Sequence, residues 1–142
     1  MAGRSFRTLI VDDDPAVVEE LSLALRLQGF AVETCTSGRD ALRLISTVPD
    51  IRVLVTDLSM PEMSGIDLLR RLAARSVSPD MRVIILSGEA TLEGVIDAIR
   101  LNVSEFLYKP VSADELASAV RRAGAAGEPP VLPPSTVKPA AA

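Results

Sequence analysis

The chain has 142 residues, 48% of them hydrophobic and 24% charged, so it is long enough to bury the core of one globular domain. Its net charge of −4 at pH 7 gives no electrostatic reason to expect nucleic-acid binding, and no apolar run reaches the roughly 20 residues that cross a bilayer. The absence of histidine excludes zinc–histidine sites and an autophosphorylating histidine, and the single cysteine, Cys35, excludes an internal disulfide. We therefore expect a cytoplasmic protein without a membrane segment, in which Cys35 is a small buried residue.

The first predicted strand, residues 7–11, ends in three consecutive carboxylates, Asp12, Asp13 and Asp14. Pro15 follows, and proline is favoured at the first position of a helix, so Asp14 is a natural N-cap for a helix over residues 15–28. Gly29 is the expected C-terminal stop of that helix. Capping explains Asp14 but leaves Asp12 and Asp13 without a structural role.

The next elements lead to Asp57. A second strand is predicted over residues 30–36, and Ser37 with Asp40 indicates the cap of a helix that ends near residue 48. A third strand over residues 51–56 places Asp57 at its carboxyl end. A carboxylate at the end of a buried strand is costly, so two interpretations stay open for this stretch alone: Asp57 caps the next turn, or it is a functional acid.

The rest of the chain repeats the alternation. We predict a helix over residues 65–75, a turn at Pro79-Asp80, a strand over residues 81–86 and a helix over residues 92–101 capped by Thr91. A last strand, residues 104–108, is followed by Ser112 and Glu115, whose spacing predicts a capping box for a helix that fades at Gly124. Residues 1–124 form the predicted domain, and the Pro/Ala-rich residues 125–142 are expected to be a flexible tail or linker.

Five strands alternating with five helices over short connections predict an α/β fold, a doubly wound parallel sheet covered on both faces. The carboxyl ends of parallel strands share one edge, where ligands bind. Five polar residues follow predicted strands and are expected to meet there: Asp12, Asp13, Asp57, Ser87 and Lys109.

The chemistry of this set suggests phosphate handling. Three neighbouring carboxylates repel one another unless a cation joins them, and an oxygen-only site suits Mg²⁺. Lys109 and Ser87 can hold phosphate oxygens beside such an ion, and an aspartate can itself be the nucleophile that forms an aspartyl phosphate.

Four motifs carry a resemblance to a known family. They are VDDDP at 11–15, TDLSMPEMSG at 56–65, ILSGE at 85–89 and EFLYKP at 105–110. In this order and spacing the chain resembles the receiver domain of a two-component response regulator, CheY-like, from residue 7 to about residue 122. The resemblance implies a flavodoxin-like sheet with strand order 2-1-3-4-5. It also implies that Asp57 accepts a phosphoryl group from a phosphohistidine on a sensor histidine kinase or histidine phosphotransfer protein.

The resemblance assigns further roles by position. Asp13 and Asp57 would ligate Mg²⁺ directly, Asp12 would do so through water, and the backbone carbonyl of Ser59 would complete the protein ligands. Lys109 would pair with Asp57 and then with its phosphate, and the Lys109–Pro110 bond would be cis.

The same resemblance implies a switch. Ser87 would turn inward to the phosphate, Phe106 would change rotamer with it, and Ser59 and Glu89 would tune hydrolysis of the aspartyl phosphate. Plainer alternatives stay open, because Ser87 could cap a loop and Phe106 could be ordinary core.

Several other positions have expected structural roles. Asn102-Val103 stands where many receivers have Gly-Ala, and Asn102 is expected to keep the left-handed helix end. Met60 and Met63 are expected to pack in the core. For Arg121 and Arg122, solvated side chains are favoured over a dimer face.

We interpret the chain as a phosphorylation-controlled switch that changes its helix 4–strand 5–helix 5 surface to control an output domain beyond residue 142 or a separate partner. It would catalyse only its own phosphorylation and dephosphorylation, and a homodimer on activation stays open. One alternative is a degenerate, non-phosphorylated receiver that acts as a docking module. Another is a Mg²⁺-dependent aspartyl-phosphate phosphatase of the haloacid-dehalogenase type, which would want an acid where this chain has Ser59.

Overall fold

The computed structural model describes residues 6–75, 81–89 and 91–125, so the predicted Pro79-Asp80 turn and the predicted tail beyond residue 125 lie outside the described residues. The described strands are β1 (Arg7–Val11), β2 (Ala31–Cys35), β3 (Ile51–Asp57), β4 (Arg82–Ser87) and β5 (Glu105–Tyr108). The helices are α1 (Pro15–Leu27), α2 (Gly38–Thr47), α3 (Gly65–Ala74), α4 (Leu92–Arg100) and α5 (Ala113–Ala125). Every predicted element is present, with ends within about two residues of the expected ones, the usual uncertainty of helix and strand boundaries.

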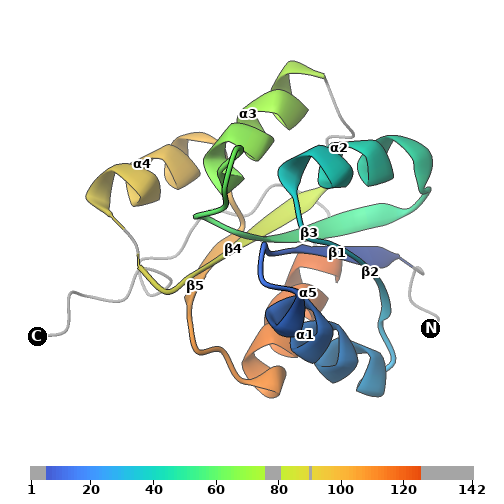
Figure 1. Ribbon diagram of the computed structural model, residues 1–142. Coiled ribbons are helices and arrows are strands. Elements are labelled where there is room, and N and C mark those ends of the chain that lie inside the picture. Colours follow the sequence, from blue (N-terminus) through green and yellow to red (C-terminus); the bar gives the residue numbers. More distant parts are fainter. Residues whose placement is uncertain (1–5, 76–80, 90, 126–142) are drawn as a thin grey trace, which may run out of the picture.

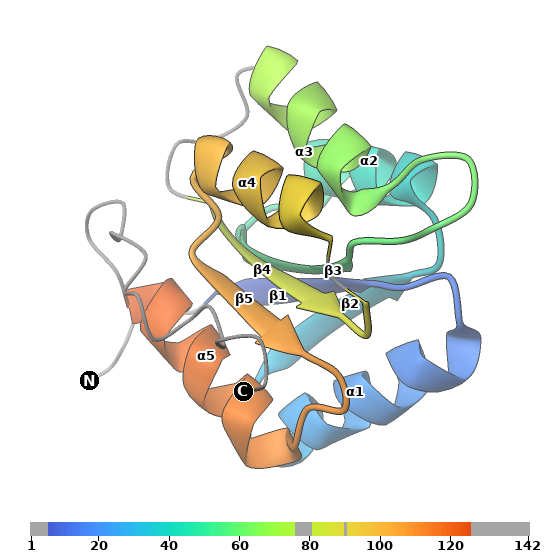
Figure 2. The same ribbon diagram turned by 90° about the vertical axis from the view of Figure 1, so that its left-hand side faces the viewer.

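All pairs of neighbouring strands are parallel, and their order is β2-β1-β3-β4-β5. Figures 1 and 2 show α2, α3 and α4 on one face of the sheet and α1 and α5 on the other. The expected doubly wound, flavodoxin-like fold is therefore confirmed. The strand order reverses next to β1, and the crevice outside the carboxyl ends of β1 and β3 is the place where such sheets bind ligands.

The core has two layers, because successive side chains of a strand point to opposite faces of the sheet. Leu9 and Leu54 pack under α2, α3 and α4, whereas their neighbours Ile10 and Val55 pack under α1 and α5. All four are at most 1% exposed. Burying each such side chain stabilises the fold by roughly 1.5–3 kcal/mol. The central strands thus hold the site residues at their ends on a rigid support.

The helix starts follow the predicted caps. Asp14 accepts a hydrogen bond from the Ala16 N–H (3.0 Å), and the side chains of Ser37 and Thr91 cap α2 and α4. Ser64 and Asp67 form a complete capping box for α3 that the sequence analysis did not single out. The helix α5 begins where the Ser112 hydroxyl accepts from the Glu115 N–H (3.0 Å), which is one of the two hydrogen bonds of the predicted capping box.

Two helix ends show what glycine and asparagine do in this chain. Gly29 (φ 92°) and Asn102 (φ 59°) adopt the left-handed conformation, as predicted for the residues that follow α1 and α4. Gly124, by contrast, does not end α5, which continues to Ala125. A Cβ at Gly124 would overlap the ring of Phe6, so this glycine leaves the space in which Phe6 packs against α5.

Three predictions about side chains can be compared with the structure. Met60 and Met63 pack against the core as expected, and Cys35 is half-buried beside it. Arg121 donates to Gln28 (2.8 Å), and Arg122 makes a two-pronged ion pair with Glu105 (2.7 and 2.8 Å). Both arginines are exposed, in agreement with the favoured solvated side chains, and they also pair within the domain. None of the helices in the described ranges combines the length and apolar character that a membrane span requires.

Candidate functional site

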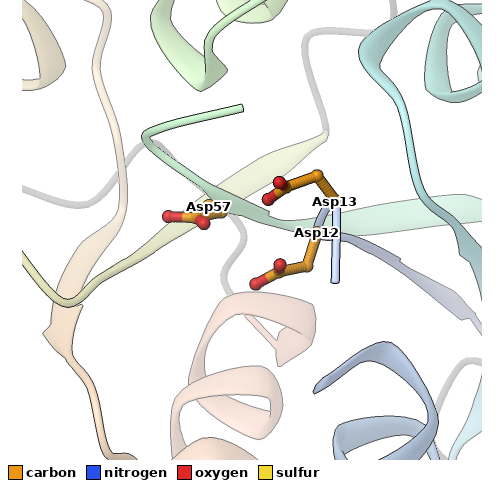
Figure 3. Close-up of side chains that lie close together, drawn as sticks. All are labelled: Asp12, Asp13 and Asp57. Atoms are coloured by element: carbon orange, nitrogen blue, oxygen red, sulfur yellow. The ribbon is translucent and has the colours of Figure 1, made fainter. Parts of the chain in front are cut away.

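Three carboxylates meet at the carboxyl edge of the sheet (Figure 3). Asp12 and Asp13 follow β1, and Asp57 is the last residue of the adjacent strand β3. One carboxylate oxygen of each lies within 4.8 Å of those of the other two. The parallel pairing of β1 with β3 brings them together, because it aligns the ends of two strands that are about 45 residues apart in the chain.

Their environments differ. Asp12 and Asp57 are 2% and 9% exposed, whereas Asp13 is exposed. Asp12 accepts a hydrogen bond from the Asp14 N–H (3.0 Å), and Asp57 accepts one from the Ser59 N–H (3.3 Å). Two carboxylates are therefore fixed by local backbone, and the third lies on the side of the cluster that faces solvent.

Lys109 follows β5 and reaches back to the same site. Its Nζ donates to Asp12 Oδ2 (2.8 Å) and to Asp57 Oδ2 (3.3 Å), and the peptide bond to Pro110 is cis. Burial alone would lower the pKa of Lys109, but its hydrogen bond to Asp12 and the negative charges of Asp57 and Asp12 outweigh burial and raise this pKa above its usual value. The side chain is thus a fixed cation at neutral pH.

The charges of the site do not balance. One ammonium faces three carboxylates, which formally leaves two negative charges uncompensated in a largely buried place. The donors are oxygens only, and the exposed Asp13 leaves an approach from solvent. A hard divalent cation such as Mg²⁺, which prefers carboxylate oxygens and keeps several waters, fits this donor set.

Ser87 lies at the end of β4 and is 1% exposed. Its hydroxyl donates to the backbone carbonyl of Glu89 (2.8 Å), and its own carbonyl accepts from the Lys109 N–H (2.9 Å). In this structure the side chain caps the β4–α4 loop, the plainer of the two roles expected for it. A hydrogen bond from Ser87 to a phosphate on Asp57 would require the hydroxyl to leave Glu89.

Phe106 is 4% exposed and belongs to the same core layer as Val103 and Ala98. Its ring lies 5.4 Å from that of Tyr108, with 49° between the planes. Sequence reasoning did not single out Tyr108, although the alternation of β5 places residues 106 and 108 on the same face. The ring of Phe106 is part of the core in this structure.

Comparison with known proteins gives the family. Residues 8–121 match the family model described as the response regulator receiver domain. The chain is 34% identical over 136 residues to the acid tolerance regulatory protein ActR of Rhizobium meliloti, covering 95% of this chain and 69% of that protein. It is 39% identical over 118 residues to the regulatory protein AtoC of Escherichia coli, covering 82% of this chain but only 25% of that protein.

Solved structures agree. The receiver domain protein (CheY-like) of Methanospirillum hungatei superposes with a TM-score of 0.78 at 26% identity, over 85% of this chain and 94% of that one. A receiver domain protein of Clostridium thermocellum does so with a TM-score of 0.75 at 34% identity, over 83% and 93%. The chain belongs to the response regulator receiver domain family, the module of two-component systems that supports phosphorylation-based signalling.

Proposed function

We propose that Asp57 accepts a phosphoryl group from a phosphohistidine on a sensor histidine kinase or a histidine phosphotransfer protein, in a reaction that requires Mg²⁺. The observation that carries the proposal is the meeting of Asp57 with Asp12, Asp13 and Lys109 at one edge of the sheet. Of the two buried carboxylates, Asp57 lies on β3, next to the strand that ends in Ser87. The adjacent position of Ser87 supports its proposed role as the hydroxyl that donates to a phosphate on Asp57.

In the proposed step, a carboxylate oxygen of Asp57 forms a bond to phosphorus while the bond from phosphorus to the donor's imidazole nitrogen breaks. The nitrogen keeps the electron pair of that bond. Asp12, Asp13 and Asp57, with the backbone carbonyl of Ser59, are the groups that would hold Mg²⁺, in line with the acidic pocket at which receiver domains generally bind this ion. When bound, Mg²⁺ supplies positive charge against the phosphoryl oxygens.

Three further residues would hold the phosphate on Asp57 or move in response to it. Lys109, held as a cation between Asp12 and Asp57, would pair with a phosphate oxygen after transfer. Ser87 would leave the carbonyl of Glu89 and donate to another. Ser87 lies on β4, the strand that pairs with β5, and Phe106 of β5 would change rotamer in response to this movement.

The output is proposed to be a change in the surface formed by α4, β5 and α5. This surface would control a domain beyond residue 142 or a separate partner, and a homodimer on activation is one form that control would take. Ser59 and Glu89, both exposed at the rim, would set how fast the aspartyl phosphate is hydrolysed. The domain would process its own phosphate and no external metabolite.

The test is intact mass after incubation with acetyl phosphate, with and without Mg²⁺. We expect the mass of one phosphoryl group on the wild-type protein only when Mg²⁺ is present, and none on Asp57→Asn. Glu93→Gln, which neutralises an exposed carboxylate in α4, is the matched control and should be phosphorylated like the wild type. A protein that binds Mg²⁺ but never gains the phosphoryl mass would favour the alternative, a receiver that works as a docking module.

A further inference from the structure

Leu58, the residue immediately after Asp57, is tied to three different elements. Its N–H donates to the carbonyl of Leu86 in β4 (3.3 Å), and its carbonyl accepts from the N–H of Gly65 at the start of α3 (2.9 Å). Its side chain is 8% exposed and belongs to the core layer under α2, α3 and α4. A displacement of Leu58 therefore has no solvent to relax into and acts on the backbone of its neighbour, Asp57.

The side chain of Leu58 lies against α4 at Gly94. We call the space left by the missing side chain of Gly94 the notch. A Cβ placed on Gly94, the third residue of this helix, would lie 2.9 Å from Leu58 Cδ2 and 3.3 Å from Thr91 Oγ1. Real Cβ atoms essentially never approach another atom that closely, so only glycine leaves Leu58 where it is.

Neither backbone conformation nor helix formation accounts for the glycine. Gly29 is the glycine with positive φ among the described residues, so Gly94 does not need the left-handed region. Glycine is also the poorest helix former after proline, and alanine would suit a helical position better. The space that Gly94 leaves for the side chain of Leu58 is a sufficient reason for glycine at this position.

We infer that Leu58 and Gly94 form a direct mechanical link between Asp57 and α4, and that Leu58 is a positioning residue for Asp57. This link is separate from the proposed route through Ser87 and Phe106, because it runs through β3 and the first turn of α4. The inference rests on the proposed function in so far as Asp57 is the phosphoacceptor. Coupling between two sites is reciprocal, so if the state of Asp57 biases the position of α4, a change in the position of α4 biases the state of Asp57 in turn.

The outer face of α4 carries exposed apolar side chains, so a movement of this helix would change an exposed surface. Leu92, Ile96 and Ile99 are 76%, 39% and 48% exposed, so the helix that rests on Leu58 carries apolar side chains on its outer face. A shift of α4 relative to Leu58 would move this apolar face as a unit, because the helix is a rigid element.

Gly94→Ala is the variant that tests the link. The added methyl group presses on a side-chain end, so we expect the fold to survive while Leu58 and the loop after Asp57 are displaced. Hydrogen exchange of residues 58–63 should be faster than in the wild type, and the affinity for beryllofluoride with Mg²⁺ should fall by about 2- to 30-fold, the range typical of residues that modulate coupling. Glu93→Ala, an exposed substitution in the same turn, is the matched control and should change neither quantity by as much as twofold.

A compensating substitution separates the link from a general loss of stability. Leu58→Val removes Cδ2, the atom that the new methyl group meets. In the double variant, Gly94→Ala should therefore change exchange and affinity much less than it does in the wild-type background, so the losses in the double-mutant cycle should be less than additive.

The outcomes are distinguishable from those of the phosphorylation test. Hydrogen exchange is measured on the resting protein, so it decides the link even if the wild type binds no beryllofluoride, a result that would count against the proposed function alone. The link is overturned if Gly94→Ala leaves the exchange of residues 58–63 as it is in Glu93→Ala. It is also overturned if Leu58→Val does not reduce the effect of Gly94→Ala.

Discussion

Lys109 makes its shorter hydrogen bond to Asp12 (2.8 Å), and the bond to Asp57 is longer (3.3 Å). The cation of the site is therefore held mainly by a residue other than the proposed phosphoacceptor. Asp12 is almost fully buried, so the ion pair compensates a charge that would otherwise be costly in the resting protein. The same ammonium stays within reach of any phosphate that Asp57 receives.

We expect Lys109→Met to destabilise the protein by about 1–3 kcal/mol, because Asp12 and Asp57 lose their hydrogen-bonded cation. Urea unfolding monitored by circular dichroism measures the loss, and added Mg²⁺ should restore part of it by taking over the charge. Arg43→Met, which breaks the exposed pair with Asp40, should cost no more than about 0.5 kcal/mol. Equal losses in the two variants would show that Lys109 is an ordinary surface lysine.

Mg²⁺ is expected to raise the melting temperature of the wild-type protein, because a ligand that binds only the folded state stabilises it, by about 2.7 kcal/mol at a concentration of 100 Kd. Asp13→Asn should reduce this gain strongly, since it removes the exposed ligand of the cluster. Asp14→Asn is the matched control, because asparagine caps a helix about as well as aspartate and residue 14 lies outside the cluster. If both variants respond to Mg²⁺ like the wild type, the ion does not bind at these carboxylates.

Gly65→Ala is expected to destabilise the protein by more than about 1 kcal/mol, within the range of substitutions that create steric overlap. A Cβ at Gly65 would collide with the carbonyl oxygen of Asp57 and approach the Cα of Leu58, and these backbone atoms have no rotamer to change. Gly88→Ala, at a position with open space around the added atom, should stay within about 0.5 kcal/mol of the wild type. Chemical unfolding measures the free energy of unfolding of both variants. Similar values for the two would contradict the close approach of α3 to Asp57.

Cys35 is expected to react slowly with iodoacetamide in the native protein. Burial, the largest cause, raises its pKa to about 11, so at pH 8 it holds about a hundred times less thiolate than a thiol at the ordinary value of 9.0. The native alkylation rate, followed by mass spectrometry, should keep rising between pH 9 and pH 11. The urea-unfolded chain is the control, and its rate should reach half of its maximum near pH 9 and level off above about pH 10. A native rate equal to the unfolded one at pH 8 would refute the raised pKa.

The amino-acid sequence by itself determined the local features of this protein. The order of strands and helices follows from hydrophobic period, and the helix starts at Asp14, Ser37 and Thr91 follow from side chains that bond to backbone within three residues. These interactions need no distant partner, so they can be inferred residue by residue. The meeting of strand ends at one edge was also accessible, because short connections force parallel strands.

Only the tertiary structure decided how distant segments share space. The hydrogen bonds of Lys109 to Asp12 and Asp57, and that of Ser87 to Glu89, depend on differences in distance of a few tenths of an ångström that no sequence pattern encodes. Gly124 shows the limit most clearly, since its place at the end of a helical segment predicted a stop, whereas the ring of Phe6 packs against it. A glycine signals that a side chain is absent, but the neighbour that needs the space is brought there by the fold.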